Sequence, residues 1–446
     1  MPAGYPAAVT SLVWFRNDLR LADNPALSEA AEHGPVVPVF IWAPEEEGDW
    51  APGAASRWWL HHSLVALDRA LRRHRSRLIV RRGPTEAALR ALCRETGAEA
   101  VLWNRRYEPA VIARDATLKL ALPCARSLPG NLLREPWAVQ NRSGGPYQVF
   151  TPFWRALQSM GDPGAPQPEP SIRSPERWPE SLAVDDLSLL PDVPWDQGLD
   201  RTWMPGEQGA LERLSSFAEG ARRYGRERDI PAAEATSRLS PYLHHGEVSA
   251  RQVWHAVRDA AGRSGESFLR QLAWREFAHH LLFHFPHTPE APLRPAFADM
   301  PWRDDQEGLR AWQQGRTGYA LVDAGMRQLW ETGWMHNRVR LVAASFLTKD
   351  LLIDWREGAR WFWDTLVDAD LANNTLGWQW VAGSGADAAP YYRVFNPSAQ
   401  AERFDRDGRY RDRWLDGELA TPIVDHAAAR ERALAAYAAT SSDGAG

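Results

Sequence analysis

Three segments of this sequence combine polar, charged and aromatic residues at spacings that could hold a ligand. The first is TSRLSPYL, residues Thr236–Leu243. Hydroxyls, an arginine and free backbone amides at the start of a helix predict a binding site for a phosphate or pyrophosphate. The alternative is an ordinary N-cap on a structural helix. A basic run with one tyrosine precedes the segment: Arg222, Arg223, Tyr224, Arg226 and Arg228.

The second segment is FLRQLAWREF, residues Phe268–Phe277. Gln271, Trp274 and Arg275 are spaced i, i+3 and i+4, so one helical face presents an amide, an indole and a guanidinium. Such a face suits a base turned out of a nucleic-acid strand, because the indole can stack on it and the guanidinium can pair with a phosphate. The simpler alternative is a tryptophan packed between helices beside a surface arginine.

The third segment, from Gly325 to Asp412, contains DADLANNTLGWQW. Its acids, amides and tryptophans predict a polar pocket with aromatic walls, and helix capping is the alternative interpretation. The residues concerned are Asp368, Asp370, Asn373, Asn374, Trp378 and Trp380.

Four histidines near the end of one predicted helix raise the question of a metal site: His279, His280, His284 and His287. No carboxylate or thiolate completes the set at a metal-ligand spacing, and the HExxH pattern is absent. We therefore expect no metal here.

The elements that must position these residues fall into two groups. Short apolar runs alternate with helical patterns at the start of the chain, which predicts a doubly wound parallel sheet. The first strand leads into RNDLRL instead of a glycine-rich turn, which argues against a dehydrogenase-type dinucleotide site. The predicted strands are 11–15, 36–42, 77–80 and 100–103, and the predicted helices are 24–32, 56–73 and 85–96.

Beyond this α/β domain, residues 161–197 are rich in proline, serine and acidic residues, which is typical of a connector running over the surface. From about Pro205 the patterns are helical. We expect an α/β fold in which residues 1–130 form the sheet domain, 131–204 a long linker and 205–446 a larger all-α domain. The Ala/Ser/Gly-rich tail after Arg432 is expected to fray.

Composition narrows the function. With a net charge of −5, any nucleic-acid binding requires a local basic patch. Two cysteines, Cys93 and Cys124, exclude a disulfide framework and a four-cysteine iron–sulfur cluster, and they favour a reducing, cytoplasmic location. We expect no membrane span, and no secretory signal at Met1–Thr10. The 23 tryptophans are an unusually high number; most are expected to fill a Trp-rich core, and an electron-transfer or base-stacking role for any of them requires support from its position.

Several of these motifs together resemble the DNA photolyase/cryptochrome family, and most closely the bacterial photolyases for cyclobutane pyrimidine dimers. The matching stretches run in order from Val13 to about Trp414. They are VWFRNDLRLADNPAL, TSRLSPYL, WREF, MRQL, TGWMHNR, DWREGARWF, GWQW, DAAPYYRVFNP and the region of Gln400.

The resemblance implies a folded FAD in the helical domain, an antenna-type role for the sheet domain, and damaged DNA as the partner of a monomer. Asn374 would face flavin N5, and Arg340 would pair with Asp368. The implied FAD-binding residues are Tyr224, Thr236, Ser237, Arg238, Leu239, Ser240, Phe268, Asn337, Arg340, Asp368, Ala369, Asp370 and Asn374.

The same resemblance implies electron transfer to the flavin through Trp302, Trp355 and Trp378, and extrusion of the dimer into a pocket over the flavin. The implied DNA contacts are Arg228, Gln271, Trp274, Arg275, Asn337, Arg338, Trp380 and Gln400.

The sequence departs from the dimer-repairing pattern at Gln271, where those enzymes usually have glutamate. Glutamine can donate a hydrogen bond but cannot supply a proton. The (6-4) enzymes share this glutamine, but they have a histidine pair where this chain has Asn337 and Leu341. Without those general acids, (6-4) repair is not expected.

We therefore expect a light-dependent lyase acting on pyrimidine dimers, with a blue-light photoreceptor of little repair activity as the alternative. An antenna chromophore is optional, with methenyltetrahydrofolate favoured over a deazaflavin. Some folate-binding relatives have Asn-Glu after a Tyr-Glu pair, whereas this chain continues Tyr107-Glu108 with Pro109-Ala110-Val111. Folate bound in another manner, in the region of Trp58 and Trp59, is the second arrangement.

Overall fold

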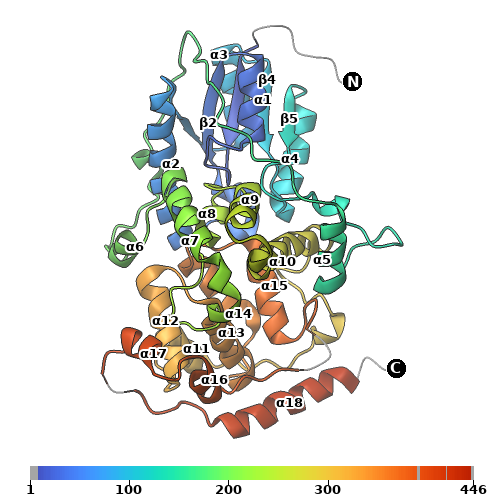
Figure 1. The fold of residues 1–446 in the computed structure, drawn as a ribbon, viewed down its shortest axis with the longest axis vertical. Coiled ribbons are helices and arrows are strands. Elements are labelled where there is room, and N and C mark those ends of the chain that lie inside the picture. Colours follow the sequence, from blue (N-terminus) through green and yellow to red (C-terminus); the bar gives the residue numbers. More distant parts are fainter. Residues whose placement is uncertain (1–8, 389–391, 418, 443–446) are drawn as a thin grey trace.

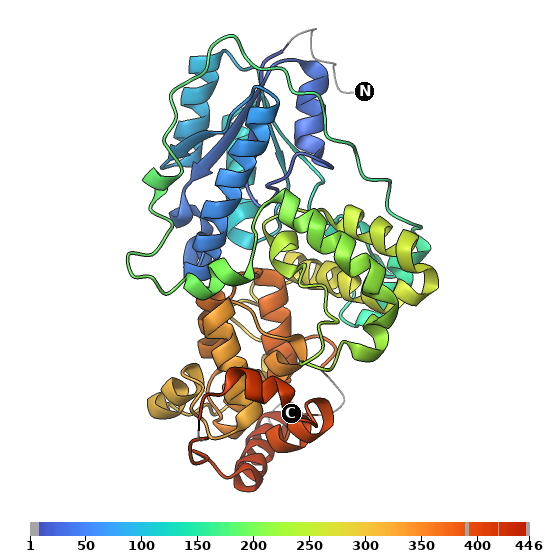
Figure 2. The same ribbon diagram turned by 60° about the vertical axis from the view of Figure 1, so that its left-hand side comes forward.

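The computed structural model describes residues 9–388, 392–417 and 419–442. Within these ranges the protein consists of a five-stranded parallel sheet flanked by helices, followed by a larger helical part (Figures 1 and 2). The fold class predicted from the sequence is confirmed.

The sheet has the strand order β3-β2-β1-β4-β5, and every neighbouring pair is parallel. Its central strand, SLVWF, is buried along its whole length, as expected for a parallel strand covered on both faces. The strands are β1 (Ser11–Phe15), β2 (Val36–Trp42), β3 (Ile79–Arg82), β4 (Ala100–Asn104) and β5 (Ala125–Leu128).

Helices cover both faces of the sheet because side chains alternate along each strand. Val13 and Phe15 of β1 pack with α1 (Pro25–His33) and α2 (Ala54–Arg73). Leu12 and Trp14 point the other way, toward α3 (Thr85–Thr96) and the end of α4 (Pro109–Ala121). The sheet is therefore doubly wound.

The connector contains two helices, α5 (Phe150–Ser159) and α6 (Gln197–Thr202), where the sequence predicts only a linker. Phe150, Phe153 and Trp154 of α5 are buried in the core of the helical part. The stretch between α5 and α6 runs along the outside of the sheet domain (Figure 2), where Leu182 bridges to Val80 of the edge strand β3 and Arg173 to Pro35 just before β2.

The helical part is built around α10 (Glu266–His284) and α15 (Leu371–Ala382), which pack against each other. Each of the two helices contributes to two apolar clusters, because α15 places Leu371 and Ala372 in one and Trp378, Val381 and Ala382 in another, and α10 is divided in the same way. The surrounding helices are α7 (Glu207–Glu227), α8 (Ser240–His244), α9 (Ala250–Ala261), α11 (Gln306–Gln313), α12 (Ala320–Thr332), α13 (Asn337–Ser345), α14 (Trp355–Thr365), α16 (Pro397–Phe404) and α17 (Arg409–Trp414).

The C-terminal tail forms the helix α18 (His426–Ser442), so the prediction that it frays after Arg432 is wrong. Ala429 and Ala433 are buried, and the Tyr437 ring stacks on Tyr392 with 4.3 Å between ring centres. Alanine has the highest helix propensity, and small side chains let the helix approach the molecule closely. In Figure 1, α18 lies at the end of the molecule farthest from the sheet.

Candidate functional site

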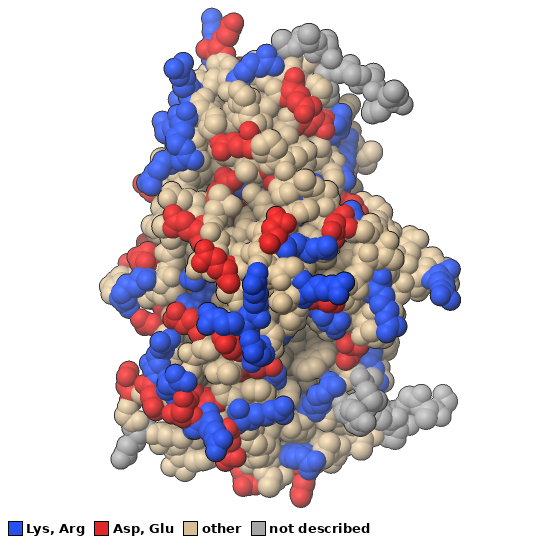
Figure 3. All heavy atoms as spheres, in the orientation of Figure 1, with Lys and Arg blue, Asp and Glu red and all other residues tan. Residues whose placement is uncertain are grey.

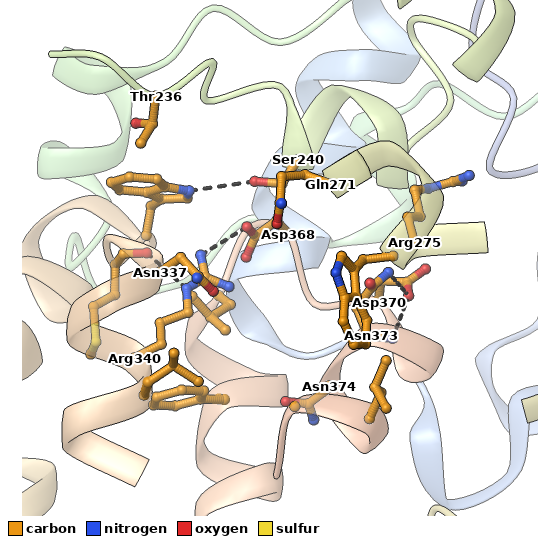
Figure 4. A pocket seen from close by; sticks show the side chains of 18 of the residues that line it. Thr236, Ser240, Gln271, Arg275, Asn337, Arg340, Asp368, Asp370, Asn373 and Asn374 are labelled. Atoms are coloured by element: carbon orange, nitrogen blue, oxygen red, sulfur yellow. Dashed lines mark hydrogen bonds and ion pairs between the residues drawn. The ribbon is translucent and has the colours of Figure 1, made fainter. Parts of the chain in front are cut away.

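A cavity of about 640 Å³ opens within the helical part, in the size range of cofactor sites. All three segments singled out from the sequence contribute side chains to its wall (Figure 4). The expected cofactor- and DNA-binding residues that line it are Tyr224, Arg228, Thr236, Ser237, Arg238, Ser240, Phe268, Gln271, Trp274, Arg275, Asn337, Arg340, Asp368, Ala369, Asp370, Asn374, Trp378 and Trp380.

One wall is the turn that leads into α8. Arg238 has a φ of +51°, the left-handed conformation that non-glycine residues rarely adopt. Its guanidinium lies 5.1 Å from the ring centre of Trp334, and the Trp334 indole donates to Ser240 Oγ at 3.4 Å. The turn therefore places a cation and a hydroxyl at the cavity wall.

The face of α10 presents Gln271, Trp274 and Arg275 to the cavity together, as their spacing requires. The Trp274 ring lies flat on Phe150 of α5, with 3.8 Å between ring centres and 8° between planes. Arg275 Nη1 donates to the carbonyl of Asn131 at 2.9 Å. Both side chains are thus held in place by the connector.

The pair of Arg340 and Asp368 forms the opposite wall, with 2.8 Å between Nη2 and Oδ2. Arg340 Nε also donates to the Met335 carbonyl at 2.7 Å. The second carboxylate oxygen, Asp368 Oδ1, is buried and has no hydrogen-bond partner among the described residues. Leaving such an acceptor unpaired is costly, so this wall is suited to a ligand that donates an N–H or O–H.

Asp370 caps the start of α15 and faces two histidines. It accepts hydrogen bonds from Asn373 N at 2.8 Å and Asn373 Nδ2 at 2.6 Å. His279 Nε2 lies 3.4 Å and His244 Nδ1 3.8 Å from Asp370 Oδ2. Burial alone would raise the pKa of Asp370, but the charge and hydrogen bonding of His279 and His244 hold it well below its usual range. Asp370 therefore stays ionised, and it raises the pKa of His279 in turn.

The amide of Asn374 has a defined orientation. Its Nδ2 donates to the Ala359 carbonyl at 3.0 Å, so Oδ1 is left as an acceptor. One helical turn further along α15, the buried Trp378 ring meets Phe362 edge-on at 5.0 Å and Trp312 at 6.1 Å. Amide and indole thus project from the same helix into the cavity.

Five expected residues lie outside the cavity lining. Trp355 is buried in the same core as Trp378, and the half-buried Trp302 packs against that core. Leu239 is buried in the other core. The last two are Arg338, which pairs with Asp229 at 3.0 Å, and Gln400 of α16.

Several lining residues were not foreseen from the sequence. His244 and Trp334 lie within or beside the recognised motifs, but nothing in their spacing distinguishes them from core residues. Arg393 stands over Trp380, with 5.2 Å from guanidinium carbon to ring centre, and Asp387 has a φ of +57°. Residues 389–391 of the DAAPYYRVFNP motif lie outside the described residues.

Trp58 and Trp59, the residues near which folate is one expected arrangement, are buried. Trp58 and Trp59 are 1% and 0% exposed, within the apolar core. The Tyr107 hydroxyl donates to Glu135 at 3.1 Å, and Glu108 pairs with Arg106 at 3.1 Å. Neither indole therefore has an exposed face in this structure, and the antenna chromophore stays a prediction.

Among the described residues, no three or more His, Cys, Asp and Glu side chains gather so that they could hold a metal ion. His280 Nδ1 and His284 Nε2 instead lie 3.0 Å and 3.4 Å from the carbonyl of Pro136. None of the helices in the described part of the chain has the length and apolar character needed to cross a bilayer.

The charged side chains are unevenly distributed over the surface. Figure 3 shows Lys and Arg gathered on this face over the helical half of the molecule, with Asp and Glu between them. A local surplus of cations can attract a polyanion even though the chain as a whole is negative.

Comparison with known proteins agrees with this geometry. The family model described as the FAD-binding domain of DNA photolyase matches residues 268–421, and the one described as DNA photolyase matches residues 11–171. A deoxyribodipyrimidine photo-lyase of Agrobacterium fabrum is 49% identical over 96% of this chain and 97% of its own. Cryptochrome-1 of Arabidopsis thaliana is 41% identical over 93% of this chain, which spans 64% of that cryptochrome.

Solved structures give the same result. The crystal structure of a bacterial class III photolyase from Agrobacterium tumefaciens has a TM-score of 0.93 and 48% identity, covering 99% of both chains. A cryptochrome of Synechocystis sp. PCC6803 has a TM-score of 0.86 and 25% identity, covering 97% of this chain and 99% of its own. From these likenesses, and from the residues that meet in the cavity, it follows that the chain belongs to the DNA photolyase/cryptochrome family.

Proposed function

We propose that this chain is a light-driven lyase that repairs cyclobutane pyrimidine dimers in DNA, with FAD held in the cavity of the helical part. The observation that carries the proposal is the composition of that cavity. Buried acids and an oriented amide line one side, and Gln271, Trp274 and Arg275 line another, so a cofactor site and a base-stacking face share one space. A photolyase is also among the relatives that match nearly the whole chain.

The residues present fit FAD. The unpaired acceptor Asp368 Oδ1 suits an N–H of the flavin ring or a hydroxyl. Arg238 and the hydroxyls of the Thr236–Ser240 stretch suit the pyrophosphate. The full set proposed to hold FAD is Tyr224, Thr236, Ser237, Arg238, Leu239, Ser240, Phe268, Asn337, Arg340, Asp368, Ala369, Asp370 and Asn374, with Leu239 supporting the turn from the core.

When bound and reduced, FAD supplies an electron to the dimer upon excitation by light. The protein orients the cofactor and the lesion, and it excludes water from the cavity. Asn374, tied to Ala359 through Nδ2, offers an acceptor oxygen and no acidic proton. Such a side chain can hold an N–H donor in place without protonating it, and the negative Asp370 nearby acts only as a fixed charge.

The lesion would lie against α10. Trp274, fixed flat on Phe150, offers a rigid stacking surface for an extruded pyrimidine dimer, and Gln271 offers hydrogen bonds to it. Trp380 with Arg393 would border the same space. The proposed DNA contacts are Arg228, Gln271, Trp274, Arg275, Asn337, Arg338, Trp380 and Gln400.

Electrons to reduce the cofactor would travel from the surface through Trp302, Trp355 and Trp378. This order follows their burial, because Trp302 is half-buried, Trp355 is buried, and Trp378 is buried and also lines the cavity.

The alternative is a blue-light photoreceptor with little repair activity. Gln271 favours it, because the residue cannot supply a proton to the lesion, and cryptochromes are among the relatives. Under either function we propose a monomer, with an antenna chromophore, methenyltetrahydrofolate ahead of a deazaflavin, as an optional second cofactor.

One experiment separates the two functions. The purified, photoreduced protein is mixed with oligothymidylate carrying cyclobutane dimers and illuminated with blue light. Recovery of thymine absorbance above a dark control is the expected result. Normal photoreduction of the flavin without any recovery would contradict repair and favour the photoreceptor.

A further inference from the structure

The only two cysteines of the sequence meet in the folded protein, although 31 positions separate them. Cys93 lies on α3 and Cys124 in the turn before β5, and the two thiols lie close together. Both pack against the apolar cluster between the sheet and α3. Arg90 Nη2 donates to the Ala121 carbonyl at 2.7 Å, so α3 is held independently beside the turn that carries Cys124.

The protein environment of Cys93 favours its protonated form, which leaves Cys124 as the thiol that reacts first. Burial, together with the neighbouring Cys124, raises the pKa of Cys93 to about 11, so Cys93 keeps its proton at neutral pH. The guanidinium groups of Arg90 and Arg94 act against this rise at Cys93 but do not outweigh burial. Both side chains are partly exposed, so a small oxidant can reach them.

We propose that Cys93 and Cys124 are a reversible dithiol–disulfide site, oxidised by hydrogen peroxide, that cross-links α3 to the entry of β5. The Cys124 thiolate attacks peroxide, an S–O bond forms, the O–O bond breaks, and hydroxide leaves. The Cys93 sulfur then attacks Cys124, the S–S bond forms and the S–O bond breaks. The Cys93 proton accompanies the departing oxygen as water. In total, two thiols and one peroxide give one disulfide and two waters.

The site is separate from the cavity and uses none of its residues, so it does not depend on the proposed repair activity. Closing a loop between α3 and β5 restricts the unfolded chain, and oxidation should therefore stabilise the sheet domain. In a reducing compartment such a bond would form only under oxidative stress and would be reversed by cellular thiols.

Peptide mapping of the full-length protein tests the proposal. The folded protein is treated with excess peroxide, blocked with N-ethylmaleimide and digested with trypsin. Cleavage after Arg90, Arg94, Lys119 and Arg126 would leave each cysteine in a short peptide. The expected product is a single species joining residues 91–94 to 120–126, which dithiothreitol separates. We expect the thermal midpoint of unfolding to rise by at least ~2 °C. Alkylated or over-oxidised thiols without the joined peptide would overturn the proposal.

Single variants test the order of attack. In Cys93→Ser, Cys124 should accumulate as a sulfenic acid that dimedone labels. In Cys124→Ser, Cys93 should remain largely unlabelled under the same treatment. Equal labelling in both variants would contradict the assigned roles. If either variant fails to fold, the joined peptide from the parent protein still decides whether the disulfide forms.

Discussion

At the scale of single residues, Gln271 is the side chain on which the proposed activity depends most. It shares the α10 face with Trp274 and Arg275 and lines the same cavity as Asp368. Its amide can donate and accept hydrogen bonds, but it cannot transfer a proton to a base that becomes negative during the reaction. A carboxylic acid at this position could form hydrogen bonds to the lesion and also transfer a proton to it.

Replacing Gln271 with Glu should therefore increase repair, by about 10-fold or more if this contact acts mainly in the transition state. The initial rate of thymine absorbance recovery under blue light measures the effect. Gln271→Ala is the matched control, and its repair rate should fall below that of the parent because the hydrogen bonds from the amide to the lesion are lost. A lower rate in Gln271→Glu than in the parent would show that the amide is the adapted residue.

Arg340 is the second residue with a clear expectation, because Asp368 depends on it. Arg340→Gln would leave a buried carboxylate without its cation, at a cost of about 3 kcal/mol in the free energy of unfolding. We expect less bound flavin per protein, measured as the ratio of flavin to protein absorbance, and a lower unfolding midpoint. Arg340→Lys keeps the charge and should lose less. Equal loss in both variants would show that the shape of the guanidinium, and not its charge, is required.

At the scale of elements, the sequence predicts the positions of the buried central strands well, but it does not predict the edge strand β5. Runs such as SLVWF and VVPVFIW are apolar throughout, and β1 and β2 have the predicted bounds. The edge strand β5 was missed because ARSL has no apolar pattern and only its first residue is buried. Pattern alone cannot identify an element whose conformation is set by pairing with a neighbour.

Helices α5 and α18 were missed for a related reason. The apolar residues of α5 have helical spacing, but the stretches around them are rich in proline and glycine and suggested a loop. The site was predicted better than these elements, because Gln271, Trp274 and Arg275 belong to one helix and their spacing fixes a common face. His244 beside Asp370 depends on how α8 and α15 meet, and no local pattern contains that information.

The packing of α14 with α15 places Trp355 and Trp378 in one core, which leads to a prediction for these helices. Trp378→Phe should slow photoreduction of the flavin sharply, because phenylalanine fills much of the space but does not donate an electron readily. Trp361→Phe, on α14 but outside the cavity lining, is the matched control and should photoreduce normally. The increase in reduced-flavin absorbance under blue light measures both. Unchanged photoreduction in Trp378→Phe would rule out the assigned path.

At the scale of the whole molecule, the sheet domain and the helical part are joined through a buried carboxylate. Glu247 is fully buried and accepts hydrogen bonds from Trp59 Nε1 at 3.1 Å and from the Ser63 hydroxyl, both on α2. It also accepts from the backbone of Gly206 at 2.6 Å. Burial outweighs these three donors and raises the pKa of Glu247 to about 8.

This raised pKa makes the stability of the joint depend on pH. The folded state binds a proton at Glu247 that the unfolded chain releases above a pH of about 4.5, so the contribution to stability is lost as pH rises toward 8. In Glu247→Gln that loss should be absent. The difference in unfolding midpoint between variant and parent should thus shift in favour of the variant from pH 5 to pH 8. The exposed Glu431→Gln is the control, and a difference independent of pH would refute the assignment.

The flat contact between Phe150 and Trp274 has a consequence for how this protein can be divided or altered. Phe150 belongs to the stretch that joins the two halves, yet it forms the floor beneath the indole proposed to receive the lesion. A shortened gene product beginning at residue 205 would keep every motif of the proposed FAD site and still lack that floor. Insertions should be tolerated in the exposed stretch 190–194 but not near 150, so evolution could lengthen one part of this connector while the other part had to change together with the substrate pocket.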